Sequence, residues 1–112
     1  MHNVNYVELH TQNVDQARAF YGELFGWKFN SLPMKPRYEE IQGPQAGGIM
    51  EEPAGSGYWL QYIDVEDVTA SAKKAQELGG KVLKPKTEVP DLGWFAIVSD
   101  PSGAPFALWQ KK

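Results

Sequence analysis

The spacing of hydrophobic and polar residues predicts a strand at residues 5–11, where the two kinds alternate. Val7, Leu9 and Thr11 fall on one face, which we expect to pack on helices. The opposite face carries a phenol, a carboxylate and an imidazole, from Tyr6, Glu8 and His10. A polar trio of this kind is unusual for a core face, so it is the first candidate for chemistry.

Helical spacing replaces this alternation at residue 14. Asn13 is a typical N-cap, and Gly26 is a typical helix stop. The apolar residues between them fall at the spacing of one helix face: Val14, Ala17, Tyr21, Leu24 and Phe25. The pattern predicts a helix over residues 14–25, followed by a strand over residues 27–32.

The same layout returns 54 residues later, because residues 67–83 align with residues 13–29. Four aligned positions are identical: Val14/Val68, Glu23/Glu77, Leu24/Leu78 and Gly26/Gly80. Roughly one identity is expected by chance at ordinary composition. The chain is therefore interpreted as an internal duplication of one structural module.

The remaining pattern completes both copies. Strands are expected at residues 37–42 and 48–52, separated by a turn that contains Gly43-Pro44 and Gly47-Gly48. The second copy should contain a strand at 58–65, a helix at 68–78 and a strand at 81–84. A proline-punctuated segment then runs to Pro90, before a hairpin of 94–99 with 105–110.

We expect the second helix to bury Val68, Ala72, Ala75 and Leu78. Both copies read βαβββ, which predicts one α+β domain of residues 1–112 with modules at about 1–53 and 58–112.

Composition narrows the function classes. The hydrophobic content of 42% and four tryptophans are typical of a folded core. A net charge of −3 and the lack of a basic stripe argue against nucleic acid as the main partner. The chain contains no cysteine, which excludes disulfides, thiolate catalysis and Cys-ligated zinc. Without an apolar signal region or a membrane-length apolar run, a cytoplasmic location without membrane attachment is the expectation.

Four phrases of the sequence point to a known family. The run ARAFYGELFGW, the entry DVEDV into the second helix, its end ELGGKV and the closing DPSGAPFALWQ resemble the vicinal oxygen chelate superfamily. That group includes glyoxalase I, bleomycin and fosfomycin resistance proteins, and extradiol dioxygenases. The resemblance implies two βαβββ modules whose mixed sheet curls around a cleft, with the helices outside. It also implies a homodimer.

The resemblance places metal ligands on the first and last strands of each module in metal-dependent members. Those four positions fall here on Tyr6, Met50, Leu60 and Ala107. Leu, Ala and Met do not bind a hard divalent cation, and a neutral phenol is a poor ligand. We therefore expect no metal site and no cofactor, and a bound divalent metal is the less favoured alternative.

The positions that face the implied cleft form the candidate ligand site: Tyr6, Glu8, His10, Met50, Leu60, Tyr62, Ala107 and Trp109. Such a lining is aromatic and apolar, with one carboxylate and one imidazole. It suits a small, partly planar organic molecule.

Glu8 is the candidate general base, although it could instead bond only to its strand neighbours. His10 could orient Glu8, or it could be a strand-end histidine that points to water. The favoured function is metal-free binding of a small molecule. The alternatives are a glyoxalase-like lyase or isomerase that uses Glu8 as base, a metal-dependent dioxygenase-type enzyme, and a dimeric structural partner without ligand.

Overall fold

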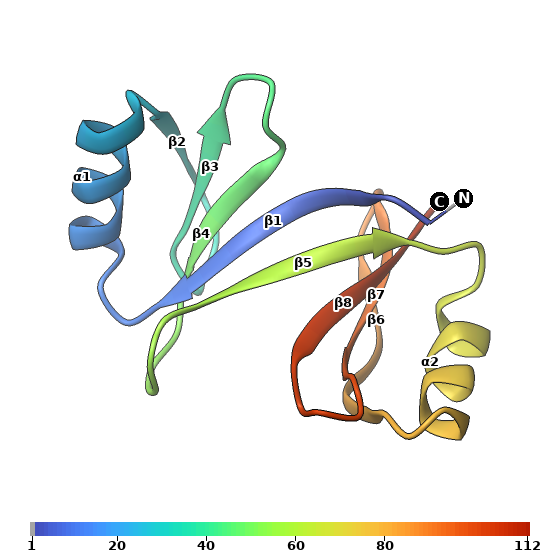
Figure 1. The fold of residues 1–112 in the computed structure, drawn as a ribbon. Coiled ribbons are helices and arrows are strands. Elements are labelled where there is room, and N and C mark those ends of the chain that lie inside the picture. The colour runs from blue at the N-terminus through green and yellow to red at the C-terminus, as the bar shows by residue number, and fades with distance from the viewer. Residues whose placement is uncertain (1) are drawn as a thin grey trace. The chain divides into compact units, whose positions relative to one another are not determined.

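The structure is a computed structural model that describes residues 2–112, and it is built from two series of βαβββ elements (Figure 1). The first series is β1 (Val4–Thr11), α1 (Val14–Phe25), β2 (Lys28–Leu32), β3 (Tyr38–Gln42) and β4 (Gly47–Glu51). The second is β5 (Tyr58–Asp64), α2 (Val68–Glu77), β6 (Lys81–Val89), β7 (Gly93–Ser99) and β8 (Pro105–Lys111). The predicted α+β class and the duplicated order of elements are confirmed.

Contacts divide the chain into two compact units. The N-terminal unit is Tyr6–Leu60, and the C-terminal unit joins the residues up to Asn5 with Gln61–Lys112. The boundaries therefore fall inside β1 and β5, and the residues between the two predicted modules, 54–57, lie within the N-terminal unit. Hydrogen bonds explain the first boundary, because the Asp64 backbone N–H donates to the Asn3 carbonyl oxygen at 2.9 Å. Asn5 also donates from its side-chain amide to the Asp64 carboxylate.

The two units repeat one strand arrangement. In the N-terminal unit the strand order is β2-β3-β4-β1, with β4 and β1 parallel and the other pairs antiparallel. In the C-terminal unit the order is β5-β8-β7-β6, again with one parallel pair, β5 and β8. This equivalence agrees with the 54-residue repeat in the sequence.

In each unit the helix covers one face of its strands. Leu9, Val14 and Ile49 are buried together in the N-terminal unit, with Ala17 and Tyr21 packed against them. Leu9 thus confirms the face that was expected to pack on the helix. The Asn13 side chain accepts a hydrogen bond from the Gln16 backbone N–H at 3.0 Å, and Gly26 ends the helix at a φ of 72°.

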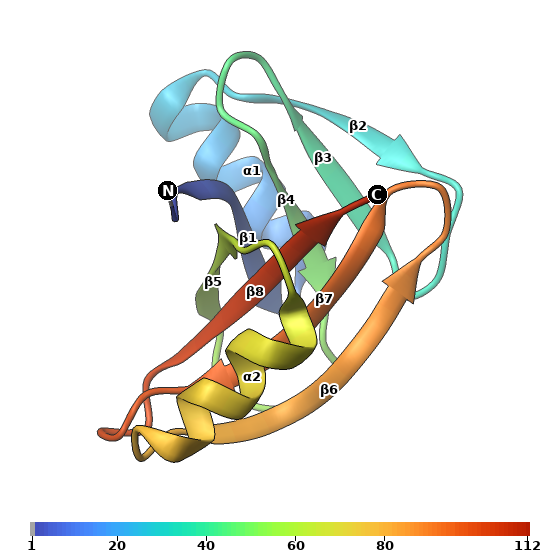
Figure 2. The same cartoon turned by 90° about the vertical axis from the view of Figure 1, so that its right-hand side faces the viewer.

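The C-terminal unit has its own core beneath α2, which Figure 2 shows in front of β6, β7 and β8. Its buried members are Val68, Ala96, Val98 and Leu108. No helix formed by residues 2–112 has the length and apolar character that crossing a lipid bilayer requires.

Burial on the two helices differs from the sequence prediction. Leu24 and Phe25 are each 57% exposed, and Leu78 is 68% exposed. The core contacts α1 at Val14, Ala17 and Tyr21 and does not extend to its last turn. Leu78 is not inside α2 but is its C-cap residue, since the helix ends at Glu77.

Two strand predictions are also wrong in detail. Strand β6 runs without interruption from Lys81 to Val89, through Pro85, with two register shifts against β7. A proline is tolerated there because β6 is the outermost strand of its unit. Gly47 and Gly48 do not form a turn but open β4, where they allow close approach of Val7 and Tyr38.

We predict that Ile49→Ala lowers the free energy of unfolding by about 2–5 kcal/mol, because it leaves a cavity in a fully buried site. Leu78→Ala should change it by less than about 0.5 kcal/mol, because that side chain is exposed. Urea denaturation of both variants measures the difference. Equal losses would contradict the observed placement of Leu78.

Candidate functional site

A hydrogen-bonded network occupies the face of β1 that is opposite α1. Its centre is Glu8, which is only 5% exposed, and its neighbour along the strand is His10, which is 4% exposed. A buried carboxylate is costly unless charge and hydrogen bonds compensate it. Both kinds of compensation are present, from His10 on one carboxylate oxygen and Tyr38 on the other.

Tyr38 reaches Glu8 from β3. Its hydroxyl donates to Glu8 Oε2 at 2.7 Å, and it is also hydrogen-bonded to the Tyr6 hydroxyl. Because Tyr38 has one hydroxyl proton and gives it to Glu8, Tyr6 is the donor to Tyr38. The Tyr38 ring lies over Gly48 of β4, where any Cβ atom would overlap the ring. A glycine at that position is therefore required for the Tyr38–Glu8 bond.

His10 lies between two carboxylates. Its Nε2 is 2.7 Å from Glu8 Oε1, and its Nδ1 is 2.7 Å from Glu52 Oε1. A neutral imidazole has only one N–H, so two carboxylate acceptors favour the doubly protonated cation. Burial lowers the pKa of His10, but hydrogen bonds to Glu8 and Glu52 and their negative charges outweigh it. The net result is a pKa above the ordinary 6.5.

An aromatic ring covers the imidazole. Tyr58 stacks on His10 with ring centroids 4.9 Å apart and an interplanar angle of 12°. Burial and the charge of Glu52 raise the pKa of Tyr58. Burial also raises the pKa of Tyr6 to about 12 and, with the charge of Glu8, raises the pKa of Tyr38. All three phenols are therefore neutral hydrogen-bond donors at neutral pH.

The structure brings together three of the predicted site residues, Tyr6, Glu8 and His10. His10 does not point to water: it is buried against Glu8, as the orienting role requires. Met50 lies opposite His10 in the β1–β4 pairing, and Leu60 is completely buried in the same unit.

The other predicted residues belong to the C-terminal unit. Tyr62 lies opposite Ala107 in the β5–β8 pairing, and its ring centroid is 6.3 Å from that of Phe95. Ala107 is completely buried. Trp109 lies opposite Asp64 and lines a hollow of about 720 Å³ beside the start of α2. Their role in ligand binding stays a prediction.

Three network members were missed by sequence reasoning: Tyr38, Glu52 and Tyr58. On the expected third strand, Tyr38 and Glu40 share one face, and Glu39 and Ile41 share the other. Each face thus pairs an apolar or aromatic residue with a carboxylate, so the pattern indicates only weakly which way the Tyr38 side chain points. Glu52 and Tyr58 flank the turn segment between the modules, outside β4 and at the first residue of β5. Nothing in their spacing indicates a contact with His10.

The residues at the family's ligand positions do not fit a divalent metal. Leu60 and Ala107 offer no donor atom, Met50 offers a thioether, and the raised pKa of Tyr6 keeps its phenol neutral. Both ring nitrogens of His10 are already used by carboxylates. Among residues 2–112, no group of three or more His, Asp or Glu side chains is arranged to hold a metal ion.

Comparison with known proteins supports the family resemblance. A family model described as bleomycin resistance protein-like N-terminal matches residues 4–44. The putative glyoxylase CFP32 of Mycobacterium tuberculosis is 32% identical over 116 residues, which cover 95% of this chain and 44% of that protein. The anthracycline biosynthesis protein DnrV of Streptomyces peucetius is 26% identical over 135 residues, covering 95% and 46%. This chain thus spans a little under half of the curated relatives it matches.

Solved structures share the fold. The hypothetical protein BH1468 from Bacillus halodurans has a TM-score of 0.74 at 11% identity, covering 99% of this chain and 95% of that one. Methylmalonyl-CoA epimerase from Streptomyces coelicolor has a TM-score of 0.70 at 14% identity, covering 97% and 94%. The solved structures show a shared fold, and the family model together with the similarity to CFP32 identifies the chain as a member of the vicinal oxygen chelate superfamily, the group of glyoxalases and bleomycin resistance proteins.

Proposed function

We propose that this chain binds a small, partly planar organic molecule at the Glu8 network, without a metal ion or other cofactor. The observation that carries the proposal is the contrast in exposure within the network. Glu8, His10 and Tyr38 are buried, whereas Tyr6 and Glu52 are partly exposed and Tyr58 is 38% exposed. The buried members hold the more exposed ones in place, which is the arrangement of a preorganised binding surface.

The exposed members define the chemistry of the ligand. Tyr58 stacks on His10 with one face of its ring, and its exposed area can pack on a flat group of the ligand. Tyr6 and Glu52 provide phenol and carboxylate oxygens beside it, which suit hydroxyl or carbonyl groups. Two relatives are named as anthracycline biosynthesis proteins, so an anthracycline, which is planar and rich in such groups, is a reasonable probe.

An enzyme of the lyase or isomerase type is the second candidate, with Glu8 as general base. It is favoured by the fixed position of the Glu8 carboxylate, which is held at both oxygens by Tyr38 and His10. The solved neighbours include methylmalonyl-CoA epimerases, which share the fold at low identity. A metal-dependent dioxygenase-type reaction finds no support, because the ligand positions do not fit a metal.

The binding proposal predicts that an anthracycline binds and that Tyr58→Ala weakens the affinity about tenfold, through loss of the stacking surface. Fluorescence titration measures both dissociation constants. Phe25→Ala is the matched control, since Phe25 is also an exposed aromatic residue, at 57%, and contacts Tyr21 and Trp27 instead of His10.

The control variant should bind like the wild type, and a chelator such as EDTA should leave the wild-type affinity and melting temperature unchanged. If both substitutions weakened the affinity equally, the ligand would have to bind outside the Glu8 network. Loss of binding, or a fall of several degrees in melting temperature, after chelation would overturn the metal-free proposal.

For the enzyme candidate, methylmalonyl-CoA in D₂O is the test substrate, with deuterium incorporation at its acidic carbon followed by mass spectrometry. A binding protein should show no exchange that depends on Glu8. Wild-type exchange that falls about 10²–10⁴-fold in Glu8→Gln, but not in the exposed control Glu23→Gln, would replace the binding proposal with acid–base catalysis.

The raised pKa of His10 predicts a dependence of stability on pH. Because its pKa is raised in the folded state, its contribution is fully present below the unfolded value of 6.5. That contribution is lost as the pH rises through the raised folded value. A His2→Gln background leaves one imidazole, and its NMR titration midpoint should lie above 6.5. A midpoint at or below 6.5 would contradict the two-carboxylate arrangement.

A further inference from the structure

The connection between β4 and β5 meets β1 at the His10 side chain. Glu52, its first residue, lies 2.7 Å from Nδ1 of His10, and Tyr58, at its other end, stacks on the imidazole ring. We call residues 52–58 the connecting segment, and Figure 1 shows it as the turn that leaves β4 and enters β5. All of these residues belong to the N-terminal unit. One titratable side chain therefore holds both ends of the connecting segment.

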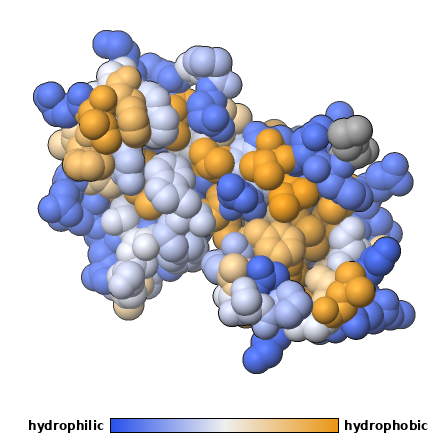
Figure 3. Space-filling view, in the orientation of Figure 1, coloured by the Kyte–Doolittle hydropathy of each residue, from blue (hydrophilic) through white to orange (hydrophobic). Residues whose placement is uncertain are grey.

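The middle of the connecting segment is held less firmly than its ends. Residues 53–57 have the sequence PAGSG and are all exposed, and a Cβ atom at Gly55 would meet nothing within 4 Å. The Gln12 side-chain amide donates to the Gly55 carbonyl oxygen at 2.6 Å, but an exposed hydrogen bond contributes only modest net stability. In Figure 3 the surface of this turn is mostly pale, so no hydrophobic patch is visible there. Apolar burial therefore does not hold the turn in place.

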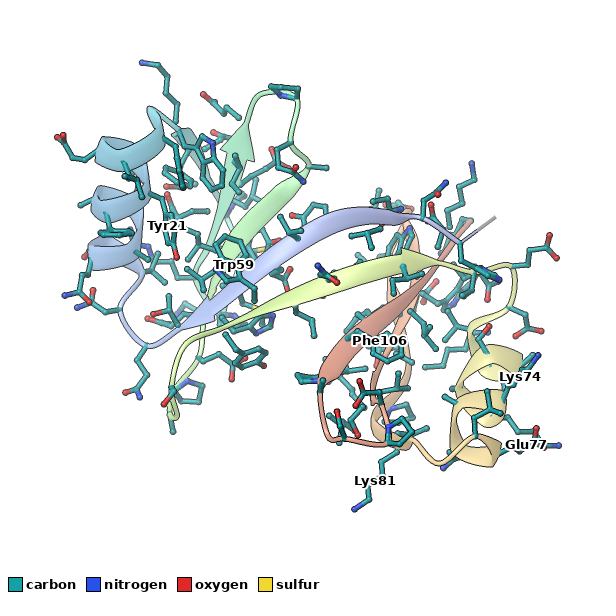
Figure 4. All side chains as sticks on the ribbon, viewed as in Figure 1. Tyr21, Trp59, Lys74, Glu77, Lys81 and Phe106 are labelled. Carbon is teal, nitrogen blue, oxygen red and sulfur yellow. The ribbon has the colours of Figure 1, made fainter. Side chains whose placement is uncertain are left out.

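The chain is anchored on both sides of this turn. The backbone N–H of Glu52 donates to the carbonyl oxygen of Thr11, at the end of β1, at 2.9 Å. On the other side, Trp59 contacts Tyr21 edge-to-face with ring centroids 5.5 Å apart, and Figure 4 shows Tyr21 directed from α1 toward Trp59. A change at the imidazole should therefore stay local, in the side chains and the turn between these anchors.

The number of protons on His10 decides how many carboxylates it can bind. The doubly protonated ring donates from Nε2 to Glu8 and from Nδ1 to Glu52. A neutral imidazole has one N–H, so one of the two hydrogen bonds must be lost when the ring loses a proton. At that position a nitrogen lone pair then faces a carboxylate oxygen, and the two repel each other.

Burial decides which of the two bonds is lost. Glu8 is 5% exposed, so water cannot replace a hydrogen bond that its carboxylate loses. The Glu52 side chain is 30% exposed, and water can solvate it. The neutral ring should therefore keep its proton on Nε2, where it binds Glu8, and give up the bond to Glu52.

We propose that loss of a proton from His10 releases the Glu52 side chain and loosens the connecting segment, so that pH regulates the site at the Glu8 network. The Tyr58 stack weakens at the same time, because an aromatic face attracts a cation more than a neutral ring. The proposal rests on the proposed function for the role of the site, but the switch itself lies in the contacts of the chain alone.

The groups around His10 leave no substitute for its charge. Met50, opposite it on β4, is uncharged. The titratable groups that face the ring are Glu8 of β1, Glu52 and Tyr58 of the connecting segment and, behind Glu8, Tyr38 of β3. Among these groups only the imidazole can carry a positive charge. Its protonation therefore sets the balance of charge between the two carboxylates.

The tautomer of neutral His10 is the most direct test. A His2→Gln background leaves one imidazole, and its proton–nitrogen correlation spectrum can be recorded above the titration midpoint. The proton should then be on Nε2. A proton on Nδ1 would mean that Glu8 and not Glu52 is released, and a ring that stays doubly protonated at about pH 9 would not act as a switch. Either result would overturn the proposal.

Motion of the connecting segment is the second readout. Carbon relaxation of the Ala54 methyl group, which does not depend on amide exchange, should show larger motion above the His10 midpoint than below it. Glu52→Gln should abolish this difference, because the glutamine amide can donate to the unprotonated Nδ1 and keep the segment in place. Glu51→Gln is the matched control, since it removes the same charge from the neighbouring exposed residue and should behave like the wild type.

An Ala54 signal that does not respond to pH, or a response that both glutamine variants abolish equally, would also overturn the proposal. In the same three proteins, anthracycline affinity should fall about threefold or more above the midpoint for the wild type and Glu51→Gln, as the preorganised surface loosens. Glu52→Gln corrects for ionisation of the anthracycline itself. Binding with the same pH dependence in all three proteins would overturn the regulatory role, whereas absence of binding at every pH, with the expected tautomer and motion, would overturn only the proposed function.

Discussion

The bond between the Glu8 carboxylate and the His10 imidazole is the interaction on which the candidate site depends. Both groups are almost completely buried, and a carboxylate alone in that position would be strongly destabilising. The protonated form of His10 supplies the opposite charge, and its second ring nitrogen is bonded to Glu52. Removing one member of such a set leaves another buried charge without compensation, so these residues act as one group.

The arrangement also supports the proposal that the site works without a metal ion. Donor atoms that could approach a cation are already bonded to one another: Tyr6 to Tyr38, Tyr38 to Glu8, and His10 to two carboxylates. The equivalents 54 residues after Tyr6 and His10 are Leu60 and Asp64. The polar network therefore belongs to one module, and the shared backbone plan does not require it.

The two modules share their backbone elements but differ in the side chains that they expose. Both keep a capped helix, an antiparallel trio of strands and one parallel pair. The first module carries the polar network on one face and exposed Phe20, Leu24 and Phe25 on its helix, whereas the second has Lys74, Leu78 and Gly79 at the corresponding positions. The buried helix residues Val14 and Val68 are shared, and the exposed positions include both an identity, Leu24/Leu78, and a divergence, Phe20/Lys74.

The sequence by itself determined the local elements, because caps, glycine stops and period-two alternation act over a few residues. Asn13, Gly26 and the faces of residues 5–11 were predicted from such signals, and the repeat followed from the identities at Val14/Val68 and Gly26/Gly80. Only the tertiary structure decided the rest. The Tyr38–Glu8 bond depends on strand register and on the missing Cβ of Gly48. The contact of Glu52 and Tyr58 with His10 depends on where the segment between the modules returns to the sheet. Helical periodicity could not show that Leu24 and Phe25 are exposed, since an apolar stripe looks the same whether its own core or a partner covers it.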